Sequence, residues 1–250
     1  MHALRRCFPR ILSSRSQRLS LIPHHTRPLS KQPSLGRDAK ARHDLIFPNS
    51  PTTKHHDLAS FLIYAERAGL DISSTVYVGT HYEYTVSSAL TQYGIHTERI
   101  GGTSDYGIDL LGIWKLPRQK DNMRIIIQCK GGSQRVSPAL IRELEGSFIG
   151  APVGWRGEGV IALLVSEKTS SKGVREAIGR SRWPMGFISC SRDGVVQQML
   201  WNQRAEEEGL RGVGVAIRHP ESKGGQSQVV LTYQGKSLQQ HPDKNVSNAG

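Results

Sequence analysis

The chain has 250 residues, of which 37% are hydrophobic, and a formal net charge of +12 at pH 7. This length accommodates one sizeable domain with tails or two small domains. No apolar run approaches the roughly 18 residues of a membrane span, so none is expected. The charge is uneven, because residues 1–37 contain seven Arg, one Lys and no acidic residue. The remaining chain is only mildly basic, which weakens any argument for nucleic-acid binding from net charge alone.

The segment 1–37 is also rich in serine, and several of its apolar residues share one side of a helical wheel, namely Leu4, Phe8, Ile11 and Leu12. An acid-free, Arg- and Ser-rich amphipathic segment is typical of a mitochondrial transit peptide. We therefore expect import into mitochondria, into the matrix, with removal of this segment. The alternative is a basic arm that contacts nucleic acid.

Residues 38–56 are predicted to form a linker, and residues 57–235 the folded domain. "DLASFLIYAERAGL" has helical spacing with Asp57 as its cap, "STVYVG" is typical of a short strand, and "HYEYTVSSALTQYG" predicts a second helix. "IHTERI" predicts a strand, which the loop "GGTSDYG" closes.

Two strands are expected at about 107–114 and 123–130, followed by a helix in "SPALIRELEGSF". "GVIALLV" has the continuous apolar pattern of a strand covered on both faces. A helix in "KGVREAIGRS", a strand "GFISC" and a helix in "DGVVQQMLWNQRAEEEGL" follow, then a hairpin from "GVGVAIR" and "QVVLTYQ" and a disordered tail at 236–250. This order predicts an α/β fold with a mixed central sheet flanked by helices.

Three polar residues meet if the two central strands pair as an antiparallel hairpin. With Trp114 opposite Met123, Asp109 lies opposite Gln128, and Lys130 shares their face because side chains alternate along a strand. The opposite face is then expected to be apolar throughout, with Ile108, Leu110, Trp114, Ile125, Ile127 and Cys129.

This grouping suits phosphate chemistry. A carboxylate can hold Mg²⁺, which keeps several waters and takes one or two protein carboxylates. A lysine beside it can stabilise negative charge that develops on an attacked phosphate, and a glutamine can supply a neutral oxygen. The alternative is that Asp109 and Lys130 are ordinary polar residues at the solvated rim of a sheet.

The pattern "GIDLLG…IIIQCK" resembles the bipartite signature of the restriction-endonuclease-like, PD-(D/E)xK fold in its Mrr-like form, where Gln-x-Lys replaces Glu-x-Lys. The order of elements from about Tyr82 to Cys190 is similar to that of this fold. The stretches "RELEG", "GVIALLVSEK", "RSRWPMGF" and "QQMLWN" further resemble the fungal mitochondrial "required for respiratory growth" family, across most of the chain.

The resemblance implies roles for individual residues. Asp109 would be the metal carboxylate, Lys130 the catalytic lysine, and Gln128 would stand at the second acidic position beside the metal. Glu83 matches a glutamate that such folds use near the metal, but "THYE" at 80–83 also spells a capping box, which would instead bond Glu83 to the backbone of Thr80. Glu143 and Glu145 could approach the site too, but are expected to face solvent.

The resulting hypothesis is a mitochondrial protein that binds DNA or RNA, with Lys130, Arg135 and Arg142 contacting the phosphates, and hydrolyses phosphodiester bonds with Mg²⁺. The alternative is a non-catalytic nucleic-acid-binding or assembly factor with the same fold, which the loss of an acid at Gln128 favours. The sequence contains no signal for the oligomeric state.

Overall fold

The structure is a computed structural model, and it describes residues 47–48, 52–101, 107–116, 122–132, 135–219 and 227–238. These residues belong to one unit, Asp44–Gly250. The predicted transit peptide at 1–37, most of the predicted linker and most of the predicted tail lie outside the described residues. Among the helices that the structure describes, none combines the length and apolar character that crossing a membrane requires.

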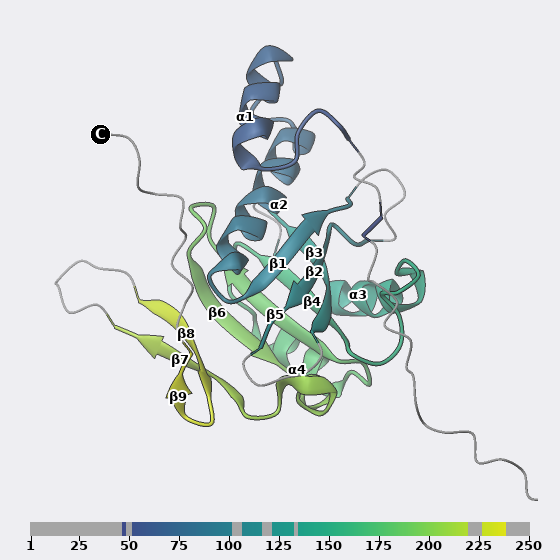
Figure 1. Cartoon of the computed structure of the whole chain (residues 1–250), viewed down its shortest axis with the longest axis vertical. Coiled ribbons are helices and arrows are strands. Elements are labelled where there is room, and N and C mark those ends of the chain that lie inside the picture. The colour runs from purple at the N-terminus through teal and green to yellow at the C-terminus, as the bar shows by residue number, and fades with distance from the viewer. Residues whose placement is uncertain are drawn as a thin grey trace, which may run out of the picture. The chain divides into compact units, whose positions relative to one another are not determined.

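A six-stranded mixed sheet forms the centre of the fold (Figure 1), with strand order β1-β2-β3-β4-β5-β6. Strands β3, β4 and β5 run parallel, and the outer pairs are antiparallel. Its strands are β1 (Ile95–Arg99), β2 (Leu110–Trp114), β3 (Met123–Lys130), β4 (Val160–Ser166), β5 (Met185–Cys190) and β6 (Val196–Trp201). The predicted mixed sheet flanked by helices is confirmed.

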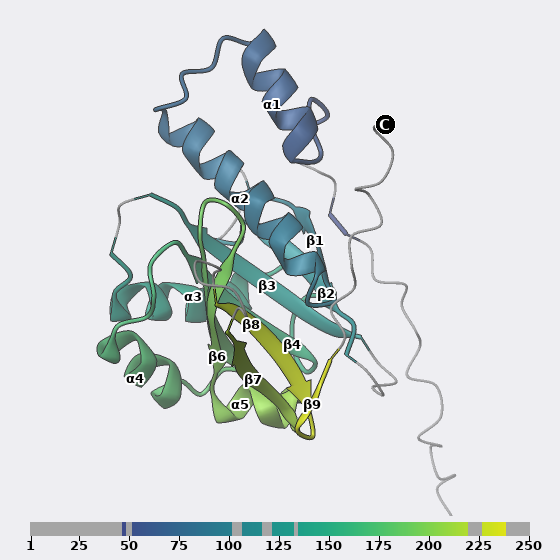
Figure 2. The ribbon, with the colours of Figure 1, turned by 90° about the vertical axis from the view of Figure 1, so that its left-hand side faces the viewer.

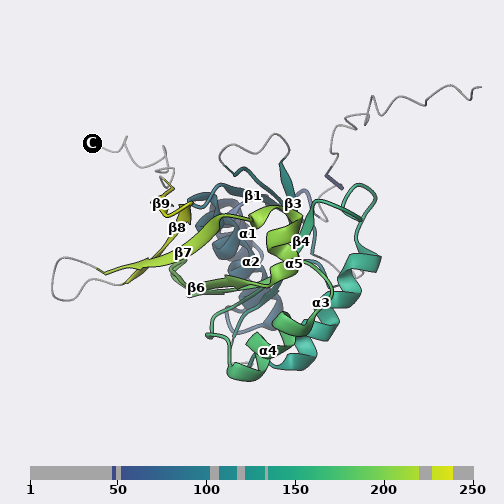
Figure 3. The same ribbon diagram turned by 90° about the horizontal axis from the view of Figure 1, so that it is seen from below.

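Helices cover both faces of this sheet. The long helix α2 lies on one face and α3 and α4 lie on the other (Figure 2), where the latter two run side by side (Figure 3). A second sheet, ordered β7-β8-β9, packs on the same face of the central sheet as α2, through Val213, Val229 and Leu231. The remaining elements are α1 (Leu58–Arg67), α2 (Thr75–Thr91), α3 (Pro138–Gly150), α4 (Lys172–Arg180), α5 (Gln203–Ala205), a π-helical turn η1 (Glu206–Leu210), β7 (Val213–Arg218), β8 (Gln228–Tyr233) and β9 (Lys236–Ser237). Strand β9 therefore falls within the segment predicted as a tail.

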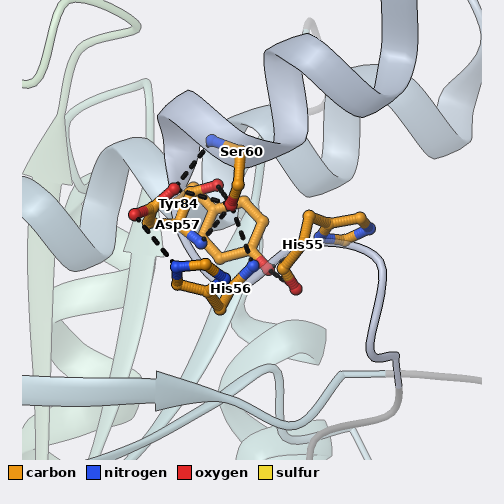
Figure 4. Close-up of polar contacts among 5 residues, drawn as sticks. All are labelled: His55, His56, Asp57, Ser60 and Tyr84. Carbon is orange, nitrogen blue, oxygen red and sulfur yellow. Dashed lines mark hydrogen bonds and ion pairs between the residues drawn. The ribbon is translucent and has the colours of Figure 1, made fainter. Parts of the chain in front are cut away.

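Helix α1 begins as predicted at Asp57, whose carboxylate accepts a hydrogen bond from the Ser60 amide at 2.7 Å. His55, just before this cap in the predicted linker, is buried. Its Nδ1 lies 2.8 Å from the Tyr84 hydroxyl of α2 (Figure 4), and its ring packs against Phe61. His55 thereby joins the start of α1 to α2.

The predicted strand "STVYVG" is wrong, because these residues form the first turns of α2. Thr75, Val76 and Val78 are β-branched and favour a strand locally. Ser74, however, caps a helix by accepting from the Tyr77 amide at 3.2 Å. Packing of α2 against the sheet then outweighs the local preference.

The predicted helix in "DGVVQQMLWNQRAEEEGL" is also wrong over its first half, which forms β6. A tight turn brings this segment beside β5, where the Gly194 amide donates to the Ser191 carbonyl at 3.0 Å and Gly194 adopts a φ of 78°. Val196 and Met199 are buried against the sheet, a spacing of three that also suits a helix. The helical part is limited to α5 and η1, which follow the N-cap Asn202.

Candidate functional site

The register of the central hairpin is as predicted. Trp114 pairs with Met123 and Leu110 with Ile127, and the Asp109 amide donates to the Ile127 carbonyl at 2.8 Å. Asp109 therefore precedes β2 by one residue and lies across from Gln128 in β3. This places Asp109, Gln128 and Lys130 at the same end of the hairpin.

The predicted apolar face is confirmed except for Ile108, because Leu110, Trp114, Ile125, Ile127 and Cys129 all belong to the core on the α2 side. Leu110 and Ile127 pack on the α2 side, but Ile108, Leu111 and Ile126 are buried on the α3 side. Because Ile108 and Leu111 lie on the same side, the alternation is broken between them, and Asp109 does not follow the Gln128 face. The carboxylate of Asp109 instead turns toward β3, where its Oδ2 accepts from the Cys129 amide at 2.6 Å.

Gln128 and Lys130 form a group with a residue that was expected to face solvent. Glu143 of α3 is half-exposed, yet its Oε1 accepts from Gln128 Nε2 at 2.7 Å and from Lys130 Nζ at 3.0 Å. Gln128 is only 2% exposed, and its Oε1 has no hydrogen-bond partner among the described residues. A buried amide oxygen without a partner is costly, so this atom is a candidate ligand for a cation.

Glu83 and Asp109 form a second group around Gly101. A Cβ built on Gly101 would lie 3.3 Å from Asp109 Oδ1 and 3.4 Å from Glu83 Oε2, so both carboxylates border the same small space. Burial first, and then the charges of Asp109 and Glu83, raise the pKa of the Cys129 thiol well above its ordinary value. The two carboxylates thus concentrate negative charge at the hairpin end.

The capping-box interpretation of Glu83 is wrong. Thr80 lies inside α2, six residues after the N-cap Ser74, so no helix start exists there. Glu83 instead forms an ion pair with Arg99 at the end of β1, and both side chains are largely buried. Glu83 therefore pairs with Arg99, which is distant in the chain, and not with the backbone of Thr80.

Residues that the sequence did not single out hold the end of β3 in place. Glu167, directly after β4, accepts from the Gly132 amide at 2.5 Å and from Arg192 Nε at 2.9 Å. The buried Tyr82 ring covers Gly131, and its hydroxyl donates to the Cys190 carbonyl at 2.8 Å. These contacts fix the chain that follows Lys130, at the carboxyl ends of the parallel strands, where open α/β sheets bind ligands.

Arg135 and Arg142, predicted to contact phosphates, are both exposed. Arg142 is next to Glu143 on α3, and Arg135 precedes that helix by three residues. Neither forms an ion pair with a carboxylate in the part of the chain that the structure describes. Both are therefore available to an anionic ligand beside the Lys130 group.

The donor atoms fit a hard cation such as Mg²⁺. Asp109 and Glu83 provide two carboxylates that border one space, and Gln128 Oε1 provides a buried neutral oxygen in the separate group with Glu143. Among the described residues, no set of three His, Cys, Asp or Glu residues suited to a metal occurs. Mg²⁺ binds through one or two carboxylates and keeps several waters, so it does not need an all-protein cage. A tetrahedral zinc site would need more ligands than these.

The family described as "Required for respiratory growth protein 7" matches residues 74–123 and 117–216. The chain belongs to this family. An uncharacterized mitochondrial protein of Schizosaccharomyces pombe is 30% identical over 155 residues, which cover 60% of this chain and 61% of that protein. The mitochondrial "Required for respiratory growth protein 7" of Vanderwaltozyma polyspora is 30% identical over 116 residues, covering 43% of this chain and 46% of that protein. The chain thus spans less than two thirds of the length of these relatives.

Among solved structures, the restriction endonuclease MspJI in complex with a 27-mer oligonucleotide is similar to this chain with a TM-score of 0.31 and 19% sequence identity. The similarity covers 50% of this chain and 29% of that enzyme.

Proposed function

We propose that this protein acts in mitochondria as a Mg²⁺-dependent nuclease that hydrolyses phosphodiester bonds of DNA or RNA and thereby supports respiratory growth. The observation that carries the proposal is the gathering of Asp109, Gln128 and Lys130 at one end of the β2–β3 hairpin, where the buried Gln128 oxygen has no hydrogen-bond partner within the described part of the chain. The mitochondrial location is supported by the names of both relatives and by the acid-free composition of residues 1–37.

Asp109 and Glu83, which border the same space, would hold the metal ion, and Gln128 would contribute its Oε1 from the neighbouring group with Glu143. When bound, Mg²⁺ would neutralise phosphate charge and lower the pKa of a coordinated water. The chain's own part is to place Lys130. Its ammonium group is hydrogen-bonded to Glu143, and it can exchange this carboxylate for a phosphate oxygen.

Glu143 would support both Gln128 and Lys130 in this site. Its Oε1 accepts from both Gln128 and Lys130, so it orients the amide that presents Oε1 and compensates the charge of the lysine. The sequence places no acid at position 128, and Glu143 is the carboxylate that the fold brings to that position instead. Glu143→Gln should therefore weaken both the placement of Gln128 and the proposed cleavage.

A second candidate function is nucleic-acid binding without hydrolysis. The observation that favours it is the engagement of Glu83 with Arg99 and of Lys130 with Glu143, because ion pairs that satisfy site residues also suit a structural role. The two functions are separated by incubating the full chain with a panel of single- and double-stranded DNA and RNA in Mg²⁺, Mn²⁺ or EDTA. Metal-dependent cleavage supports the nuclease, and salt-dependent binding without cleavage supports the alternative.

A further inference from the structure

The segment "RSRWPMGF", residues 180–187, joins α4 to β5 and has no part in the site described above. Its tryptophan, Trp183, is 41% exposed, which is unusual for so large an apolar side chain. One face of the ring stacks on Phe148 of α3, with ring centroids 4.7 Å apart and an interplanar angle of 19°. The remaining exposed ring surface therefore faces away from the core.

The position of Trp183 is fixed by its backbone. The Trp183 amide donates to Ser181 Oγ at 3.2 Å, and that hydroxyl donates to Glu145 Oε1 at 2.6 Å. On the other side, the Trp183 carbonyl accepts from the buried Asn202 side chain at 2.8 Å, and Pro184 follows. A ring held this firmly loses little conformational freedom when a ligand stacks on it.

Positive charge lies beside this ring in the chain. Arg180 and Arg182, three residues and one residue before Trp183, are exposed, and no carboxylate within the described ranges forms an ion pair with either. The nearby Glu145 is engaged by Ser181. An exposed aromatic ring preceded by two arginines without a described carboxylate partner suits a ligand that combines flat, apolar groups with negative charge, which is the chemistry of a nucleic-acid strand.

Helix α3 connects this ring to the candidate site. Glu143 contacts Lys130, and Phe148 stacks on Trp183. These two residues are five positions apart on the helix. Five residues turn a helix by about 140°, so these two side chains leave it in different directions, and the sheet gives the better measure of the separation. Lys130 is level with Ser166 and Met185 with Ala162, so Trp183 lies about six residues, or roughly 20 Å, back along the strand direction. A strand whose phosphate lies at Lys130 therefore reaches Trp183 in about six nucleotides at roughly 3.4 Å each.

We propose that Trp183, with Arg180 and Arg182 just before it in the chain, is a stacking platform for an unpaired base, so that the nucleic acid bound at the Lys130 site is single-stranded where it crosses α3. Bases inside a duplex have their faces covered by their neighbours, whereas an unpaired base can stack on an aromatic side chain. This inference rests on the proposed function, because it names the substrate class of the same site.

Tryptophan fluorescence of the full chain tests the proposal directly. Trp114 and Trp155 are 1% and 0% exposed, whereas Trp201 is only partly buried, so the part of the quenching that Trp183→Phe removes is the part assigned to Trp183. We expect a short oligothymidylate to quench the fluorescence and to protect it from acrylamide, and a blunt duplex of the same length to do neither. Trp183→Phe, which keeps an aromatic ring against Phe148, should lose this signal.

Affinity provides the second measurement. Stacking of one base on an aromatic side chain is worth about 1–3 kcal/mol, so Trp183→Ala should weaken oligothymidylate binding about fivefold to a hundredfold and leave duplex binding unchanged. Ile149→Ala is the matched control, because Ile149 is an apolar residue of α3 that is 72% exposed and has no ring to stack. The affinity of this variant for oligothymidylate should equal that of wild type.

The outcomes separate this proposal from the proposed function. If folded Trp183→Ala and Trp183→Phe proteins bind oligothymidylate as wild type does, the platform is rejected, whatever the cleavage assay shows. If Ile149→Ala loses as much oligothymidylate affinity as Trp183→Ala, the loss does not depend on an aromatic ring and the platform is likewise rejected. Quenching that depends on Trp183 without any metal-dependent cleavage retains the platform and rejects hydrolysis.

Discussion

Replacing Gly131 by alanine tests how rigidly the chain after Lys130 is held. A Cβ at this position would lie 3.1 Å from three atoms of the Tyr82 side chain, Cβ, Cγ and Cδ1. Tyr82 is 2% exposed and its hydroxyl is bonded to the Cys190 carbonyl, so the ring cannot move aside without breaking a buried hydrogen bond. Overpacking of this kind costs about 1–3 kcal/mol.

The unfolded state offsets part of this cost. Gly131 does not have a positive φ, so alanine is allowed there, and the loss of glycine's freedom in the unfolded chain stabilises by about 0.4–1 kcal/mol. We therefore expect Gly131→Ala to lower the free energy of unfolding by about 1–2 kcal/mol. Gly146→Ala is the control, because Gly146 lies inside α3 with no atom within 4 Å of its Cβ position, and it should gain about 0.5–1 kcal/mol.

Urea unfolding followed by circular dichroism measures both changes as shifts of the midpoint at constant slope. The two variants should shift in opposite directions. A Gly131→Ala protein as stable as the Gly146→Ala protein would show that Tyr82 can yield, and the argument that the Lys130 segment is clamped between Tyr82 and Glu167 would fail.

Three further predictions follow from the structure and the sequence. Burial and, second, the charge of Arg99 lower the pKa of His55 below its ordinary value of 6.5. The unfolded chain therefore binds this proton more readily than the folded chain, and stability should fall as the pH drops below about 6.5. Melting curves of His55→Gln should lose this pH dependence, whereas those of His56→Gln, changed at an exposed neighbour, should keep it. Reversing the charges of Arg135 and Arg142 should weaken nucleic-acid binding and flatten its salt dependence, and an unchanged isotherm would exclude these residues from the interface. Deleting residues 2–37 from a tagged chain should leave it in the cytosol, and arrival of the deleted form in the matrix would overturn the transit-peptide hypothesis.

Sequence reasoning succeeded where the deciding contacts are local. The register of the β2–β3 hairpin follows from alternating side chains on either side of a short polar turn, so the placement of Asp109 across from Gln128 could be predicted. The cap at Asp57 could be predicted for the same reason, because its partner Ser60 is three residues away.

Contacts between residues distant in the chain could not be predicted from the sequence. Nothing near Glu83 indicates that Arg99 will be its partner, and the local capping pattern was the stronger signal. Glu143 and Glu167 reach the end of β3 only because right-handed crossovers place α3 and β4 beside it. The segment of β6 has a spacing that suits a helix or a strand, and pairing with β5 determines which forms.

The most direct test of the proposed hydrolysis compares wild type with Asp109→Asn, Lys130→Ala and the double variant in a single-turnover cleavage assay with Mg²⁺, with EDTA as the blank. Asparagine retains an oxygen that can accept from the Cys129 amide, so folding should be preserved while the metal carboxylate is lost. Because the two residues act on the same step, each single variant should abolish cleavage and the double variant should be no worse. Wild-type cleavage by folded Asp109→Asn protein, or additive losses in the double variant, would contradict the proposed site.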